Sequence, residues 1–215
     1  MESRGSAERM TGTVPSMDAG SRSERDEQLR AHTYSLLALL LNAPPGAQTL
    51  ELLAGIDVDD GAQGSMAGSW AMLKLAGARV GQSALDDEYH ALFVGITMGE
   101  VVPYGCWYLS GVLMDKPLVR LRQDLEYLGI ERRADVHEPE DHAGALCETM
   151  ALLCSEPEAF TPAMQREFFG AHIAPWMALF FRDLQKAPSA CFYQAVGRLG
   201  EAFINFERQY LATPA

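Results

Sequence analysis

The sequence has little positive charge. Its 215 residues include 17 lysines and arginines against 29 aspartates and glutamates, a formal net charge of −12 at pH 7. Binding to nucleic acid or to anionic lipid without sequence preference requires clustered cations, so neither is expected as a partner. The longest apolar run, Leu36 to Leu41, has six residues, whereas a membrane-spanning helix needs about 20. We therefore expect no transmembrane helix and no direct insertion into a membrane.

Several motifs of nucleotide, metal and disulfide chemistry are missing. There is no GxxxxGK[ST] or GxGxxG phosphate loop, no HExxH and no CxxC. The four cysteines (Cys106, Cys147, Cys154, Cys191) are too few for a secreted disulfide scaffold, and no N-terminal apolar stretch could form a signal-peptide core. We expect a cytoplasmic protein with reduced thiols, no metal site and no tightly bound cofactor; weak GTP binding stays open.

What is present is helical periodicity. Residues 1–23 lack it and carry three acids and three bases, which predicts a disordered tail followed by one all-helical domain over 24–215. Within that domain no convincing period-two strand occurs. The sequence predicts an all-α fold of about eight to ten helices, expected over residues 24–43, 49–56, 63–79, 85–95, 107–114, 118–128, 139–155, 162–186 with an interruption at Pro175, and 189–211.

Two local signals set predicted helix starts. Ser83 followed by Asp86 is typical of a capping box, and Pro139 suits a first helical turn. Gly129 stands where a helix would end with a left-handed residue.

Two segments contain no lysine or arginine at all: residues 80–115, with five acids, and residues 134–165, with seven. If they meet in space, they form an acidic surface beside aromatic residues, suited to a peptide that carries both arginine and apolar side chains. The alternative is that the acids only complement helix N-termini. The aromatic residues are Tyr89, Phe93, Tyr104, Trp107 and Tyr108; the acids concerned are Asp86, Asp87, Glu140 and Asp141.

The segment HEPEDH, from His137 to His142, is the most informative short stretch. It is interpreted as a hinge or a binding loop, in which a histidine beside acids can titrate near neutral pH. Acid–base catalysis, or a metal held by His137, Asp141 and His142, is the alternative. Because no second ligand cluster accompanies it, we expect a protein that is not an enzyme. A GTP-dependent or metal-dependent hydrolase, or a generic helical scaffold, remains as an alternative.

Three stretches taken together resemble a known family. LDDEYHALFVG (85–95), VVPYGCWYLSG (101–111) and EPEDHAGALCETMALL (138–153) resemble the TorD/DmsD family of redox-enzyme maturation chaperones in order and spacing. The EPxDH element is the most specific of them, and the likeness covers most of residues 30–210. In the family's PYxSxY pattern this chain has Cys106 in place of serine.

The resemblance implies an all-helical cytoplasmic chaperone. It would bind the twin-arginine signal peptide and the apo form of a molybdenum-cofactor oxidoreductase, assist cofactor insertion and prevent premature export. It would exist as a monomer or as a domain-swapped dimer, with a hinge over residues 129–139. The molybdopterin cofactor would belong to the client.

The resemblance also implies the residues of the site. The EPxDH match points to Glu138, Pro139, Asp141 and His142 as the hinge and signal-peptide loop. The helix and loop matches add Tyr89, Phe93, Pro103, Tyr104 and Tyr108. Trp107 is added for its place among these aromatic residues.

Overall fold

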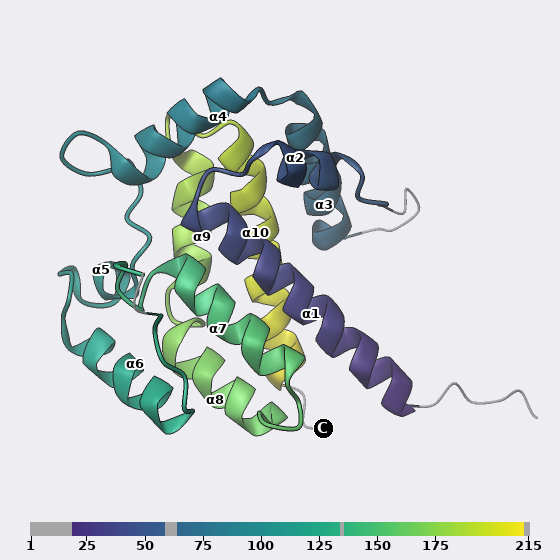
Figure 1. The fold of residues 1–215 in the computed structure, drawn as a ribbon, viewed down its shortest axis with the longest axis vertical. Coiled ribbons are helices and arrows are strands. Elements are labelled where there is room, and N and C mark those ends of the chain that lie inside the picture. Colours follow the sequence, from purple (N-terminus) through teal and green to yellow (C-terminus); the bar gives the residue numbers. More distant parts are fainter. Residues whose placement is uncertain (1–18, 59–63, 134–135, 213–215) are drawn as a thin grey trace, which may run out of the picture.

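The computed structural model describes residues 19–58, 64–133 and 136–212 (Figure 1). Over these ranges the chain forms ten α-helices and one π-helix and contains no β-strand, which confirms the all-α prediction. In chain order they are α1 (Ala19–Asn42), α2 (Ala47–Ala54), α3 (Ser65–Arg79), α4 (Gln82–Tyr89), the π-helix η1 (His90–Val94), α5 (Gly105–Ser110), α6 (Lys116–Tyr127), α7 (Ala143–Ser155), α8 (Pro162–His172), α9 (Met177–Lys186) and α10 (Phe192–Ala212).

The first helix begins earlier than its sequence indicates. Of the tail predicted over residues 1–23, residues 1–18 lie outside the described part of the chain, and residues 19–23 belong to α1. Adding a turn to an existing long helix costs little, because nucleation is the expensive step. None of the helices in the described ranges has both the length and the apolar composition needed to span a membrane.

Proline and glycine end or start the helices largely as predicted. Pro117 and Pro162 lie in the first turns of α6 and α8, where a missing N–H costs nothing. The Thr161 hydroxyl accepts a hydrogen bond from the Met164 N–H at 3.3 Å and caps α8. The residues around Pro175 separate α8 from α9. Gly129 follows α6 with a φ of 70°, the left-handed conformation that glycine adopts without strain.

Two predicted helix starts were wrong. Gly81 precedes α4 without any side-chain cap, and Asp86 accepts instead from Gln82 Nε2 at 2.9 Å, so Ser83 and Asp86 form no capping box. Pro139 lies outside α7, which begins only at Ala143. The reason is tertiary, since hydrogen bonds to the loop before α5 hold the Pro139 segment in a non-helical path.

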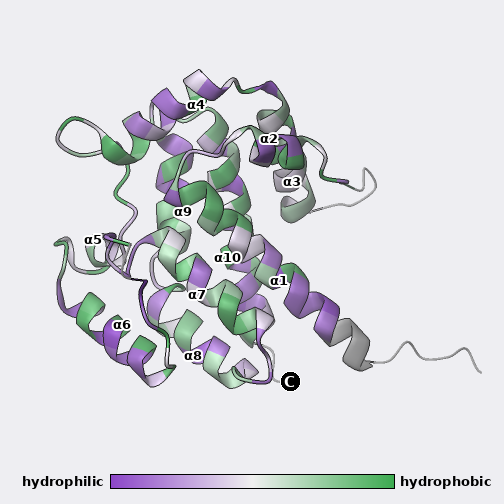
Figure 2. Ribbon diagram, viewed as in Figure 1, coloured by the Kyte–Doolittle hydropathy of each residue, from purple (hydrophilic) through white to green (hydrophobic). Residues whose placement is uncertain are grey.

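The core is built from one face of α1 and from α7, α9 and α10. Helix α7 packs along α1, and α10 packs against α9 and α3. Figure 2 shows hydrophobic residues along α9 and α10 in the middle of the molecule, whereas α1 is mostly hydrophilic just after its grey first turns. On α1 the buried face runs through Tyr34, Leu37 and Leu41. Leu29, in the N-terminal part of the same helix, is 58% exposed.

A buried polar cluster joins the first helix to the last. The Arg30 guanidinium donates to both carboxylate oxygens of Glu207 at 2.7 and 2.9 Å, and its Nη1 donates to Gln165 and to Glu27. The Tyr34 hydroxyl donates to Glu207 at 3.0 Å. Glu207 is fully buried and Arg30 nearly so. Such a pair is stable only when its remaining hydrogen bonds are satisfied, as they are here.

Candidate functional site

The segment EPEDH, residues 138–142, which we call the EPEDH segment, lies directly against the loop that precedes α5. Tyr104 and His142 form an isolated antiparallel bridge. The Gly105 N–H donates to the Asp141 carbonyl at 2.9 Å, and the Ala143 N–H donates to the Pro103 carbonyl at 2.8 Å. The two segments without lysine or arginine therefore meet in space, as the sequence analysis required for a shared site.

Asp141 holds this junction together from inside. It is 4% exposed, and its Oδ2 accepts from the Cys106 N–H in the first turn of α5 at 2.8 Å. A carboxylate at a helix N-terminus satisfies donors that have no partner within the helix. Asp141 therefore complements a helix N-terminus, the alternative role given above for these acids. Its carboxylate completes α5 and is not presented to solvent.

His142 is the N-cap residue of α7. Its Nδ1 accepts from the Gly144 N–H at 3.1 Å, so the ring proton of the neutral imidazole resides on Nε2. His142 is 6% exposed, and its ring meets the Tyr104 ring edge-on at 5.3 Å between centroids. Burial lowers the pKa of His142, against the opposing charges of Glu138 and Asp141. A Cβ at position 144 would overlap the Asn42 side-chain amide, so a larger residue there requires this exposed side chain to turn away.

Glu138 is the exposed carboxylate of the junction. Its Oε2 accepts a hydrogen bond from the Tyr104 hydroxyl. Burial, together with this bond, raises the pKa of Tyr104 above its usual range. Burial and the charge of Glu138 also raise the pKa of Tyr89 to about 12. Glu138, Tyr104, Tyr89 and His142 thus form one group at the junction, of which Glu138 is the exposed member.

The other predicted aromatic residues divide between two places. Phe93 packs with Tyr89 and with Tyr193 of α10, at 5.0 and 5.2 Å between ring centroids. Tyr108 instead stacks on Trp176 at 5.4 Å and donates its hydroxyl to Asp183 at 3.2 Å.

Of the two tryptophans near the loop before α5, Trp107 was predicted from the sequence and Trp176 was not. Trp107 is 39% exposed on α5. Trp176 is 1% exposed and was not foreseen as a partner of the loop before α5. Its ring lies 3.2 Å from the position of a Cβ on Gly105. Its place directly after Pro175 was the available signal.

A cavity of about 260 Å³ lies between residues 130–133, residues 136–140 and α7. We call it the acid-rimmed pocket, because four carboxylates and two arginines surround an apolar floor. The carboxylates are Glu131, Glu138, Glu140 and Glu148, the arginines Arg132 and Arg133, and the floor comprises Leu125, Ile130, Val136, Ala145 and Leu152, with Thr149 beside it.

One of these carboxylates already has cationic partners. Arg122 Nη2 lies 2.8 Å and Arg132 Nε 3.8 Å from the Glu140 carboxylate. Burial alone would raise the pKa of Glu140, but the hydrogen bond and charge of Arg122 leave it lowered. Glu140 was expected on an open acidic surface. That expectation overlooked Arg122 and Arg132, which come from the chain between the two cation-free segments.

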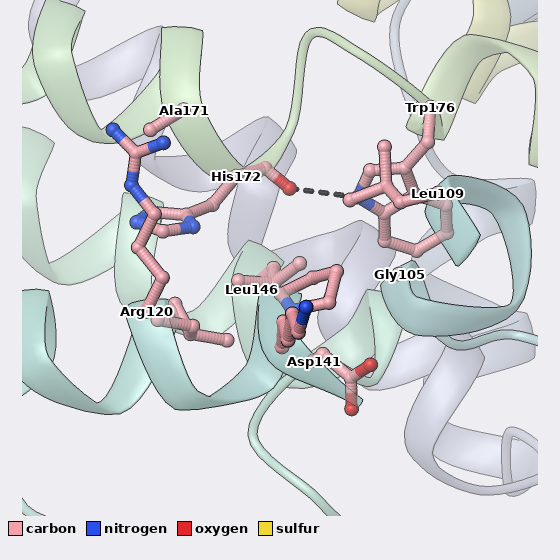
Figure 3. A pocket seen from close by; sticks show the side chains of 11 residues that line it. Gly105, Leu109, Arg120, Asp141, Leu146, Ala171, His172 and Trp176 are labelled. Atoms are coloured by element: carbon pink, nitrogen blue, oxygen red, sulfur yellow. Dashed lines mark hydrogen bonds between the residues drawn. The ribbon is translucent and has the colours of Figure 1, made fainter. Parts of the chain in front are cut away.

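A second cavity, of about 300 Å³, is lined by both Asp141 and Trp176. Figure 3 shows Arg120 and His172 on one side of this cavity and Trp176 on the other. Trp176 Nε1 donates to the His172 carbonyl at 2.7 Å, and His172 Nε2 lies 2.7 Å from Asp124 Oδ2. These contacts fix the rings that form its walls.

Within the described ranges, no three histidine, cysteine, aspartate or glutamate side chains are grouped so that they could hold a metal ion. The metal alternative at His137, Asp141 and His142 therefore finds no support. Cys147 and Cys154 are free, buried thiols on α7. Burial raises the pKa of Cys154 to about 12, so it is a poor nucleophile.

Comparisons with known proteins identify relatives of this chain. It is 26% identical over 133 residues to the chaperone protein TorD of Shewanella pealeana, covering 58% of this chain and 59% of that protein. It is 25% identical over 150 residues to TorD of Vibrio cholerae, covering 66% and 68%. The fold is similar to a crystal structure from Archaeoglobus fulgidus described as a redox enzyme maturation protein, with a TM-score of 0.55 and 19% identity over 84% of this chain and 94% of that one.

The family comparison covers the site itself. A family model described as nitrate reductase delta subunit matches residues 59–182, a range that includes the loop before α5, the EPEDH segment and the acid-rimmed pocket. The chain therefore belongs to this family, the TorD family of redox-enzyme maturation chaperones.

Proposed function

We propose that this chain is a cytoplasmic maturation chaperone. It binds the twin-arginine signal peptide and the apo form of a molybdenum-cofactor oxidoreductase, assists cofactor insertion and prevents premature export. The observation that carries the proposal is the meeting of the EPEDH segment with the loop before α5, beside a pocket that combines carboxylates with an apolar floor.

The acid-rimmed pocket suits the chemistry of such a leader. A twin-arginine leader has a basic pair followed by an apolar stretch, so its binder needs carboxylates next to apolar surface. Glu138 and Glu148 are exposed at the rim, and the floor is aliphatic. Charge steers the encounter, and burial of apolar side chains holds the complex.

Exposed apolar side chains offer further surface for a client. Two loops carry them, one after η1 and one between α5 and α6, and both lie along the left edge of the molecule in Figure 1. Apolar residues gathered at a surface are typical of binding regions. The exposed residues are Ile96, Met98, Val112, Leu113 and Met114. We assign them to contacts with the unfolded or apo client.

In this proposal the chain contributes binding and no catalysis. The molybdenum cofactor belongs to the client, which the chaperone holds until insertion is complete. Because the leader has to be covered before translocation, the complex forms in the cytoplasm. The chaperone itself is a monomer or a domain-swapped dimer that exchanges helices about residues 129–139.

The proposal is tested by isothermal titration calorimetry with a synthetic leader peptide. The intact protein should bind the peptide, and replacing the peptide's two arginines by alanines should abolish most of the affinity. The double variant Glu138→Gln/Glu148→Gln should bind the arginine peptide about tenfold more weakly, a free-energy change of about 1.4 kcal/mol. Higher salt should lower the association rate constant of the peptide by a larger factor than it raises the dissociation rate constant.

The matched control is Glu51→Gln. This exposed glutamate on α2 changes the net charge without touching the pocket, and its affinity should stay close to that of the parent. Equal binding of the arginine and alanine peptides would refute leader recognition and favour a generic helical scaffold.

A further inference from the structure

The acid-rimmed pocket contains an arginine pair that belongs to the chain itself. Arg132 and Arg133 line it together with the four glutamates, and apolar Ile130 and Val136 lie on either side of them in the sequence. A basic pair next to apolar residues is the chemistry that the proposed function assigns to the client's leader. The chain thus presents to its own pocket the kind of group that the pocket is proposed to bind.

The contacts of Arg132 are those of an arginine that is held loosely. Its Nη1 donates to the Glu138 carbonyl at 3.1 Å, while its Nε lies 3.8 Å from Glu140 Oε1, beyond hydrogen-bond distance. Its side chain is 41% exposed. Exposed ion pairs of this kind contribute little to stability.

Arg122 makes the tighter contact on the same carboxylate. Its Nε donates to Glu140 Oε2 at 2.9 Å, and its Nη2 lies 2.8 Å from the same oxygen. Arg122 therefore fixes the position of Glu140, and Glu140 Oε1 and the Glu138 carbonyl face Arg132. These two acceptors suit the planar donor set of a guanidinium.

We propose that Arg132 is an internal placeholder, and that an arginine of the client's twin-arginine motif replaces it against Glu140 and the Glu138 carbonyl. This rests on the proposed function and adds how the site is regulated. In the client-free chain Arg132 occupies the pocket in most molecules. The apparent affinity for a leader is therefore the affinity of the open pocket multiplied by the fraction of molecules in which Arg132 has left it. A peptide with only one matching feature competes poorly with an arginine that is already tethered beside the site.

The test compares Arg132→Gln with Arg198→Gln by calorimetry, using a leader peptide with two arginines. Arg198 is an exposed arginine on α10, so this control removes the same charge from an acidic protein at a distance from the pocket. Arg132→Gln should tighten binding about three- to tenfold, and Arg198→Gln should change it much less. With the alanine peptide the two variants should behave alike.

A second measurement follows Arg132 itself in the unmodified protein. The Nε–H resonance of Arg132, identified by its loss in Arg132→Gln, should shift to the position of a solvent-exposed arginine when the leader peptide is added. Circular dichroism of each variant checks that the helices are intact.

The possible results separate the two ideas. If the parent protein binds the arginine peptide but Arg132→Gln binds no more tightly than Arg198→Gln, or if the Arg132 resonance does not move, the placeholder is refuted and leader binding stands. If neither the parent nor any variant distinguishes arginine from alanine peptides, the proposed function fails as well.

Discussion

Replacing Asp141 by alanine should destabilise the junction between α5 and α7. The carboxylate accepts from the Cys106 N–H at 2.8 Å, and both residues are almost fully buried. Alanine would leave that N–H without a partner, a cost of roughly 1–3 kcal/mol, toward the upper end for a charged acceptor. Taking about 2 kcal/mol, Tm should fall by about 4–8 °C for a domain of this size. Asp141→Asn keeps an acceptor oxygen and should lose about half as much.

Urea unfolding followed by circular dichroism measures this effect. The midpoint should fall while the slope m is unchanged, because the surface exposed on unfolding stays the same. Glu131→Ala is the control: this exposed carboxylate lies in the chain shortly before the EPEDH segment, so its loss should shift the free energy of unfolding by less than about 0.5 kcal/mol. If Asp141→Ala unfolds at the parent's midpoint, Asp141 does not hold the junction, and its carboxylate becomes a candidate for direct contact with the client.

The remaining predictions concern the start of α7. Burial lowers the pKa of His142 below its ordinary value of 6.5, so the unfolded chain binds more protons; stability should therefore be complete above about pH 6.5 and fall as the pH drops below it. His142→Asn still caps the helix and should make the urea midpoint depend less on pH between pH 5 and 7.5. A smaller dependence should remain because burial also lowers the pKa of His172. Gly144→Ala turns the exposed Asn42 amide aside and breaks its hydrogen bond to Glu148, whereas Gly170→Ala, with open space around it, should be neutral or slightly stabilising. Gly144→Ala should therefore be the less stable of the two by about 0.5–1.5 kcal/mol; equal stabilities would contradict the tight fit.

The helices and their punctuation could be predicted because local physics decides them. Pro117, Pro162 and Pro175 restrict the backbone wherever they occur, and the apolar repeat of α10 buries Phe192, Val196, Leu199 and Phe203 as its spacing requires. The likeness to a known family placed the EPEDH segment near the loop before α5, and the hydrogen bonds between them support that placement.

The charge of the site could not be predicted in the same way. A local count found two segments without cations, yet Arg122 and Arg132 reach Glu140 from α6 and from the loop after it. Pro139 suited a helix start by its own preference, but tertiary hydrogen bonds moved that start to Ala143, with His142 as the N-cap. Both outcomes depend on pairings between residues distant in sequence, which periodicity does not encode.

The bond between Arg30 and Glu207 joins partners separated by 177 positions. At about 5–20 residues per second, the ribosome needs roughly 10–35 s to add the second partner after the first. Until then the guanidinium of α1 lacks its carboxylate partner from α10. A protein proposed to shelter unfinished polypeptides therefore passes through such an unfinished state during its own synthesis.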